Sequence, residues 1–155
     1  MGYDAALEEA LCFGWVDSTH LKLDGDRSML WLTARKRGSV WSRLNKQRVE
    51  RLTAAGRMAP AGLAAVEAAQ QSGAWSLLDA VEDLVVPDDL DAAFARHPGS
   101  RPQWDGFPRS ARRGILQWVV QAKRPETRAR RVEEAATLAA RGERANQWRG
   151  RTASP

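Results

Sequence analysis

The chain has 155 residues, of which 43% are hydrophobic and 28% charged, and its formal net charge is +5. This length suits one domain, or one domain with a small helical extension, and the basic balance favours an anionic partner. The single cysteine excludes an internal disulfide, and no apolar run approaches the roughly 20 residues of a membrane span. The start of the chain lacks the basic and apolar regions of a signal peptide, so a cytoplasmic location is expected.

The first third of the chain predicts a helix followed by a β-hairpin. Apolar side chains share one side of a helix over residues 3–13, which Gly14 ends. Residues 15–23 and 27–35 form two strand patterns around the Asp24-Gly25 pair. That pair is a hairpin signal because both residue types tolerate a positive φ.

A basic stretch follows, with seven Lys or Arg side chains between residues 35 and 51. Gly38 breaks the strand, and Ser39 is the expected N-cap of a helix that ends at Gly56. The predicted apolar stripe of this helix lies at Trp41, Leu44, Arg48, Val49 and Leu52. Pro60 begins a further helix that runs to about residue 72.

The second half predicts an irregular connection at residues 74–87 and then helices at 89–96, 101–107, 109–122 and 125–141. In the last of these, Arg130 is expected to pair with Glu133 or Glu134. The predicted fold class is α+β, a small antiparallel hairpin or sheet packed on helices and followed by an all-helical part. The predicted divisions are an N-terminal α+β domain at 1–73, the connection, a helical domain at 88–142 and a flexible tail at 143–155.

Three blocks of the sequence resemble, in order, the YdeI/OmpD-associated family of bacterial proteins. They are YDAALEEALCFGWVDS, RKRGSVWSRLNKQRVERLTAAGRMAPAGLAAVEAA, and the segment from VPDDLDAAFARHP to SARRGILQWVVQAKRPETRARRVEEAATLAARGE. The resemblance implies a link to stress tolerance, including resistance to cationic antimicrobial peptides and bacteriocins, with no established reaction or cofactor. The chain lacks the helix and strand that usually precede the first of these blocks in the family, which implies a shortened chain or a sheet with one strand fewer.

The end of the second strand pattern forms a basic corner, which is the leading candidate for a binding site. Guanidinium groups beside a capped helix N-terminus suit a phosphate or carboxylate, and a tryptophan there can stack on a ring or pack inward. The structural alternative is an ordinary capped helix with a solvated basic side. The candidate ligand-binding residues are Trp15, Arg35, Lys36, Arg37, Ser39, Trp41, Ser42 and Asn45.

Cys12, Asp17 and His20 are the candidate catalytic residues if the protein is an enzyme. They lie where the first helix gives way to the hairpin, although a lone cysteine is usually a small core residue. Two isolated histidines without a carboxylate cluster predict no metal site, and the sequence predicts no cofactor.

The leading functional prediction is a non-enzymatic binding or stress-tolerance protein that recognises an anionic small molecule or a protein partner at the basic corner. A small-molecule enzyme that uses Cys12, Asp17 or His20 is the first alternative. The second is a nucleic-acid-binding protein, for which only weak, non-specific affinity is expected because acidic residues are interspersed with the basic ones. The sequence assigns neither a ligand nor an oligomeric state.

Overall fold

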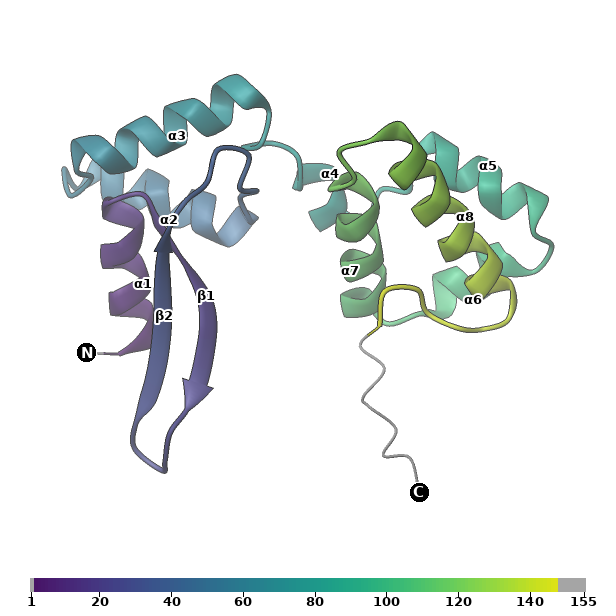
Figure 1. Ribbon diagram of the computed structural model, residues 1–155, viewed down its shortest axis with the longest axis horizontal. Helices are drawn as coiled ribbons and strands as arrows, with labels where there is room; N and C mark the ends of the chain where they lie inside the picture. The colour runs from purple at the N-terminus through teal and green to yellow at the C-terminus, as the bar shows by residue number, and fades with distance from the viewer. Residues whose placement is uncertain (1, 148–155) are drawn as a thin grey trace. The chain divides into compact units, whose positions relative to one another are not determined.

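A computed structural model describes residues 2–147 of the chain (Figure 1). Its internal contacts divide the chain into two compact units, Met1–Asp79 and Ala80–Pro155. The first contains α1 (Tyr3–Cys12), β1 (Trp15–Lys22), β2 (Ser28–Ala34), α2 (Arg43–Ala54) and α3 (Pro60–Ser72). The predicted α+β class is confirmed, since a two-stranded antiparallel hairpin precedes a helical remainder.

The hairpin turns where the Asp24-Gly25 pair predicts, but for a different reason. Gly25 is not among the glycines with a positive φ. The loop is instead closed by the Asp24 carboxylate, which accepts hydrogen bonds from the backbone N–H groups of Asp26 and Arg27. The Asp24 side chain therefore stabilises the turn through these hydrogen bonds, and a glycine with a positive φ is not required.

Close backbone approach joins α1 to α3. Gly14 ends α1 with a φ of +75°, and the Cys12 carbonyl oxygen accepts a 3.0 Å hydrogen bond from the Ala59 N–H, just before α3. A Cβ added to Gly62 on α3 would lie 2.2 Å from that carbonyl oxygen. Only glycine fits at Gly62 without movement of the two helices.

The helix of the basic stretch begins later than predicted. Ser39 is not its N-cap; α2 begins at Arg43, and Ser42 caps it by accepting from the Asn45 N–H. The predicted stripe is also wrong at Leu44, which is 55% exposed, whereas Trp41, Val49 and Leu52 are buried. Trp41 enters the core from the extended segment before the helix, which shifts the helix start and the buried face.

Two of the four basic residues of α2 are paired with acidic residues of α1, and a third, Lys46, is paired with Asp79. Arg48 pairs with Asp4 at 2.7 Å, and Arg51 pairs with Glu8. Just after α2, a guanidinium nitrogen of Arg57 lies 3.2 Å from a Glu9 carboxylate oxygen. Beneath these pairs lies the core of the unit, formed by Leu7, Leu11, Cys12, Trp41, Val49, Leu52, Ala69 and Ala74.

The second unit is helical, as predicted. Its elements are α4 (Asp79–Glu82, which begins at the end of the first unit), α5 (Asp88–Arg96), α6 (Ser100–Gly106), α7 (Arg109–Val120) and α8 (Pro125–Ala140). The helices α5, α6 and α7 all contact α8, around a core that includes Leu90, Trp104, Ile115, Leu116 and Ala136. Within the predicted flexible segment 143–155, Ala145 is buried, and residues 148–155 lie outside the described part of the chain. The domain limits drawn from the sequence stay a prediction.

The ion pairs expected within α8 form between helices instead. Glu133 is bound by Arg96, at 3.0 Å, and by His97 rather than by Arg130. Arg128 reaches Asp89 near the start of α5 with two hydrogen bonds, of 2.6 and 3.0 Å. The side chains of α8 therefore fasten α5 to α8 instead of bracing α8 alone.

Candidate anion-binding site

The basic corner is a hydrogen-bonded turn between β2 and α2. The Arg35 N–H donates to the Gly14 carbonyl oxygen at 3.0 Å, which extends the strand pairing by one residue. The Lys36 N–H then donates to the Ser39 hydroxyl at 3.1 Å, and the Ser39 N–H donates to the Lys36 carbonyl at 2.9 Å. Gly38, at a φ of +84°, allows the chain to turn between them.

Arg35 points inward and stacks on Trp41. Its guanidinium carbon lies 3.6 Å from the centroid of the Trp41 ring, and one terminal nitrogen donates to the Val40 carbonyl at 3.2 Å. The Nε atom is buried and has no hydrogen-bond partner in the described part of the chain. Burial lowers the pKa of Arg35 to about 10, and the nearby negative charge of Asp17 partly opposes this shift.

A small pocket opens beside this stacked pair. Its volume is about 70 Å³, against the roughly 10–15 Å³ that one water molecule needs. The short side chains of α3 on the far wall leave this space free, since a longer side chain would fill it. The lining residues are Arg35, Lys36, Arg37, Gly38, Ser39, Trp41, Ala65, Ala68 and Ala69.

The nearby carboxylate of Asp17 partly offsets the charge of Arg35, but the other two cations at the pocket are not paired within the described residues. Lys36 and Arg37 are exposed, and neither forms an ion pair with any residue between positions 2 and 147. This contrasts with Arg48 and Arg51 on α2, whose charges are paired with α1. An oxyanion in the pocket would meet up to three cations, which is the arrangement that binds phosphate or carboxylate groups.

The structure thus brings together five of the eight predicted ligand-binding residues and separates three. Arg35, Lys36, Arg37, Ser39 and Trp41 line one pocket. Trp41 is 1% exposed and its face is occupied by Arg35, so the tryptophan forms part of the wall and has no free face for a ligand ring.

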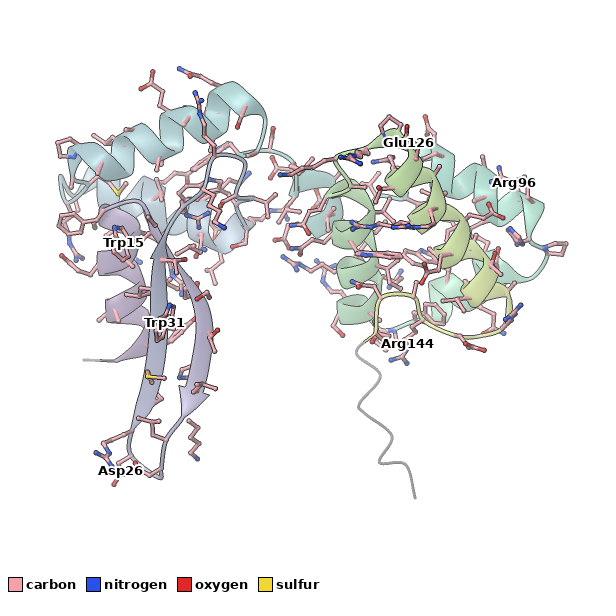
Figure 2. All side chains as sticks on the ribbon, in the orientation of Figure 1. Trp15, Asp26, Trp31, Arg96, Glu126 and Arg144 are labelled. Carbon is pink, nitrogen blue, oxygen red and sulfur yellow. The ribbon has the colours of Figure 1, made fainter. Side chains whose placement is uncertain are left out.

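The other three ligand-binding candidates are engaged elsewhere. Ser42 caps α2, and the Asn45 side-chain oxygen accepts from Arg48 at 3.1 Å. Trp15 lies at the start of β1 (Figure 2), where it lines a different depression.

That depression is an apolar groove between α1 and the hairpin, with a volume of about 440 Å³. Trp15, 44% exposed, lies in it together with Phe13 and Leu32, while Glu9 is its one charged lining residue. This groove was not predicted from the sequence. Two aromatic residues on either side of the helix-ending Gly14 were the signal that could have indicated it.

The candidate catalytic residues do not form a reactive set. Cys12 is buried in the core of the unit, and burial raises the pKa of its thiol, which disfavours the reactive thiolate. Asp17 instead accepts a 2.8 Å hydrogen bond from the Tyr3 hydroxyl, and the rings of Tyr3 and His20 lie 5.3 Å apart. Sequence reasoning missed Tyr3, which joins Asp17 and His20 on the exposed hairpin.

In residues 2–147, no group of three His, Cys, Asp or Glu side chains lies close enough together to hold a metal ion. No helix in the same part of the chain has both the length and the apolar character that crossing a membrane would require.

Comparison with known protein families gives two separate matches. Residues 83–142 match the family described as "Bacteriocin-protection, YdeI or OmpD-Associated". Residues 1–65 match a different model, described as "Domain of unknown function (DUF8412)". The predicted family resemblance is confirmed by the first match, which covers most of the helical second unit. No curated protein and no solved structure matches the chain.

Proposed function

We propose that this chain, whose residues 83–142 are a YdeI/OmpD-associated family domain, is a non-enzymatic binding protein that recognises an anionic group at the basic corner. One observation carries the proposal. The Arg35 guanidinium is held on Trp41 at a pocket shared with Lys36 and Arg37. Within residues 2–147 the buried Arg35 Nε atom has no hydrogen-bond partner, and Lys36 and Arg37 form no ion pair with a carboxylate.

The electrostatics of the corner support an anion as the ligand. Burial disfavours the charged form of Arg35, as its lowered pKa reflects. A bound anion would offset this cost because it supplies the opposite charge and an acceptor for hydrogen bonds. The pocket volume of about 70 Å³ suits a single phosphate, sulfate or carboxylate group. The rest of a larger molecule, or of a protein partner that presents such a group, would lie outside the pocket.

The biological role that fits this binding is stress tolerance. The description of the family matched by residues 83–142 names bacteriocin protection. The protein would then act in the cytoplasm, where its basic corner binds an anionic metabolite or an acidic partner. This binding would contribute to tolerance of antimicrobial peptides, in line with the family description. The enzymatic alternative is weaker because Cys12 is buried with a raised thiol pKa.

Calorimetric titration with inorganic phosphate, together with thermal unfolding in phosphate and in chloride of equal ionic strength, tests the proposal. Phosphate should raise the midpoint of unfolding, since a ligand of the folded state stabilises it by mass action. The double variant Lys36→Ala/Arg37→Ala should lose the effect. Lys22→Ala, which removes an exposed cation of the hairpin, is the matched control and should keep it. No phosphate-specific shift, or an equal shift in the double variant, would refute the proposed site.

A further inference from the structure

The outer edge of β2 presents unpaired backbone groups. At one end of the hairpin the Leu23 N–H donates to the Arg27 carbonyl, and at the other the Arg35 N–H donates to the Gly14 carbonyl. Because backbone groups alternate in direction along a strand, those of Met29, Trp31 and Thr33 face β1. Those of Leu30 and Leu32 therefore point away from β1. The described residues form only a two-stranded sheet, so no third strand pairs with this edge.

Apolar side chains lie on both faces of the sheet beside this edge. The pairs Leu21 with Met29 and Thr19 with Trp31 share the face opposite α1, and Trp31 there is 59% exposed (Figure 2). On the α1 side, Leu32 lines the apolar groove. A strand alternates its side chains between the two faces. A strand added beside β2 would thus cover apolar surface on both faces and satisfy the outward backbone groups at the same time.

The two edges of the hairpin differ in how they are protected. β1 carries the ionisable residues Asp17, His20 and Lys22 and an irregularity in register between Asp17 and Thr19, which are features that discourage edge pairing. β2 (Ser28–Ala34) contains no charged residue, no proline and no glycine. Its edge is therefore the open one.

The sequence pattern of β2 indicates what pairs with it. When a strand pairs antiparallel with its own copy about a two-fold axis, the residue on the axis faces its own copy and the residues on either side of it face each other. With the axis at Trp31, Trp31 faces Trp31 and Leu30 faces Leu32, so apolar side chains meet on both faces and no charge is buried. We infer that β2 pairs antiparallel with β2 of a second copy of this chain, which gives a four-stranded sheet across a two-fold axis. This goes beyond the proposed anion binding and does not depend on it.

Sedimentation velocity over a range of protein concentrations, combined with amide hydrogen exchange, tests the inference. A reversible dimer is expected. The Leu30 and Leu32 amides should become protected from exchange as the dimer forms, while those of Met29 and Trp31, which already face β1, should be protected in the monomer too. A chain that stays monomeric at every concentration, or a dimer in which the Leu30 and Leu32 amides remain unprotected, would overturn the inference.

Variants give an independent check. Trp31→Lys places two lysines near each other across the two-fold axis and should weaken the dimer at least about tenfold, since like-charge juxtaposition costs several kcal/mol. Leu23→Lys is the matched control, because Leu23 is equally exposed, at 58%, but lies beyond the end of β1. It should leave the dimer intact. Circular dichroism establishes that both variants fold. Equal dimerisation of the Trp31→Lys variant and the wild-type protein would place the interface elsewhere.

Discussion

Arg35 and Trp41 form the structural centre of the basic corner. The guanidinium carbon lies 3.6 Å from the centroid of an indole that is 1% exposed. The indole also contacts Trp75, with ring centroids 5.0 Å apart. The Arg35 guanidinium is therefore held in place by its contact with a core residue.

Arg35→Ala should lower the free energy of unfolding by roughly 1–3 kcal/mol. The substitution removes a desolvated cation–π contact, worth about 2 kcal/mol or more, and exposes part of the Trp41 ring. Equilibrium unfolding in urea, followed by tryptophan fluorescence, measures the change.

Arg37, two residues further along the chain, supplies the control for Arg35. Arg37 is exposed and has no ion-pair partner among residues 2–147, so Arg37→Ala should leave the urea midpoint unchanged. Equal urea midpoints for the two alanine variants would contradict a stabilising contact between Arg35 and Trp41.

The sequence indicated the corner but not its geometry. Local signals placed Arg35, Lys36, Arg37 and Gly38 together, because a strand pattern ends there and glycine breaks it. They could not choose between Ser39 and Ser42 as N-cap, since both are serines before a helical pattern. The burial of Trp41 in the extended segment before the helix makes Ser42 the N-cap. That burial depends on contacts with α3 and with Trp75, which rules based on neighbouring residues do not include.

The charge on α2 shows the same limit. Pairing rules for helices consider partners three or four residues away. The partners of Arg48 and Arg51 are Asp4 and Glu8, more than forty residues earlier in the chain. Only the packing of α1 against α2 shows that these two charges are matched.

Gly62→Ala should destabilise the first unit by about 1–3 kcal/mol, the usual cost of overpacking. The new Cβ would lie 2.2 Å from the Cys12 carbonyl oxygen, so α1 and α3 must separate. Gly114→Ala on α7 is the control, because its Cβ would meet nothing within 4 Å. There alanine should stabilise by about 0.5–1 kcal/mol through helix propensity. Thermal unfolding of both variants measures the contrast, and an unchanged Gly62→Ala protein would contradict the close α1–α3 approach.

Cys12 should be almost inert toward iodoacetamide in the folded protein. Its thiol is in the core and burial raises its pKa, so the thiolate is scarce and the reagent is excluded. Reaction in urea should be fast, and mass spectrometry at timed intervals follows both. Rapid alkylation of the folded protein would instead revive Cys12 as a nucleophile and with it the enzymatic alternative.

The Asp89–Arg128 pair predicts a pH dependence of the second unit. The Arg128 guanidinium, through two hydrogen bonds, lowers the pKa of the Asp89 carboxyl below its ordinary value. Because the folded-state pKa lies below the unfolded value of about 3.9, the contribution is complete above that pH and is lost as the pH falls through the folded pKa. Both side chains are about a third or more exposed, so the contribution is at most about 1 kcal/mol.

Arg128→Gln should remove this contribution at pH 7. The difference in unfolding free energy between the variant and the wild-type protein should be smaller near pH 3, when urea unfolding is measured at both pH values. A gap that is equally wide at both pH values would show that Arg128 acts through packing and not through the charge of Asp89.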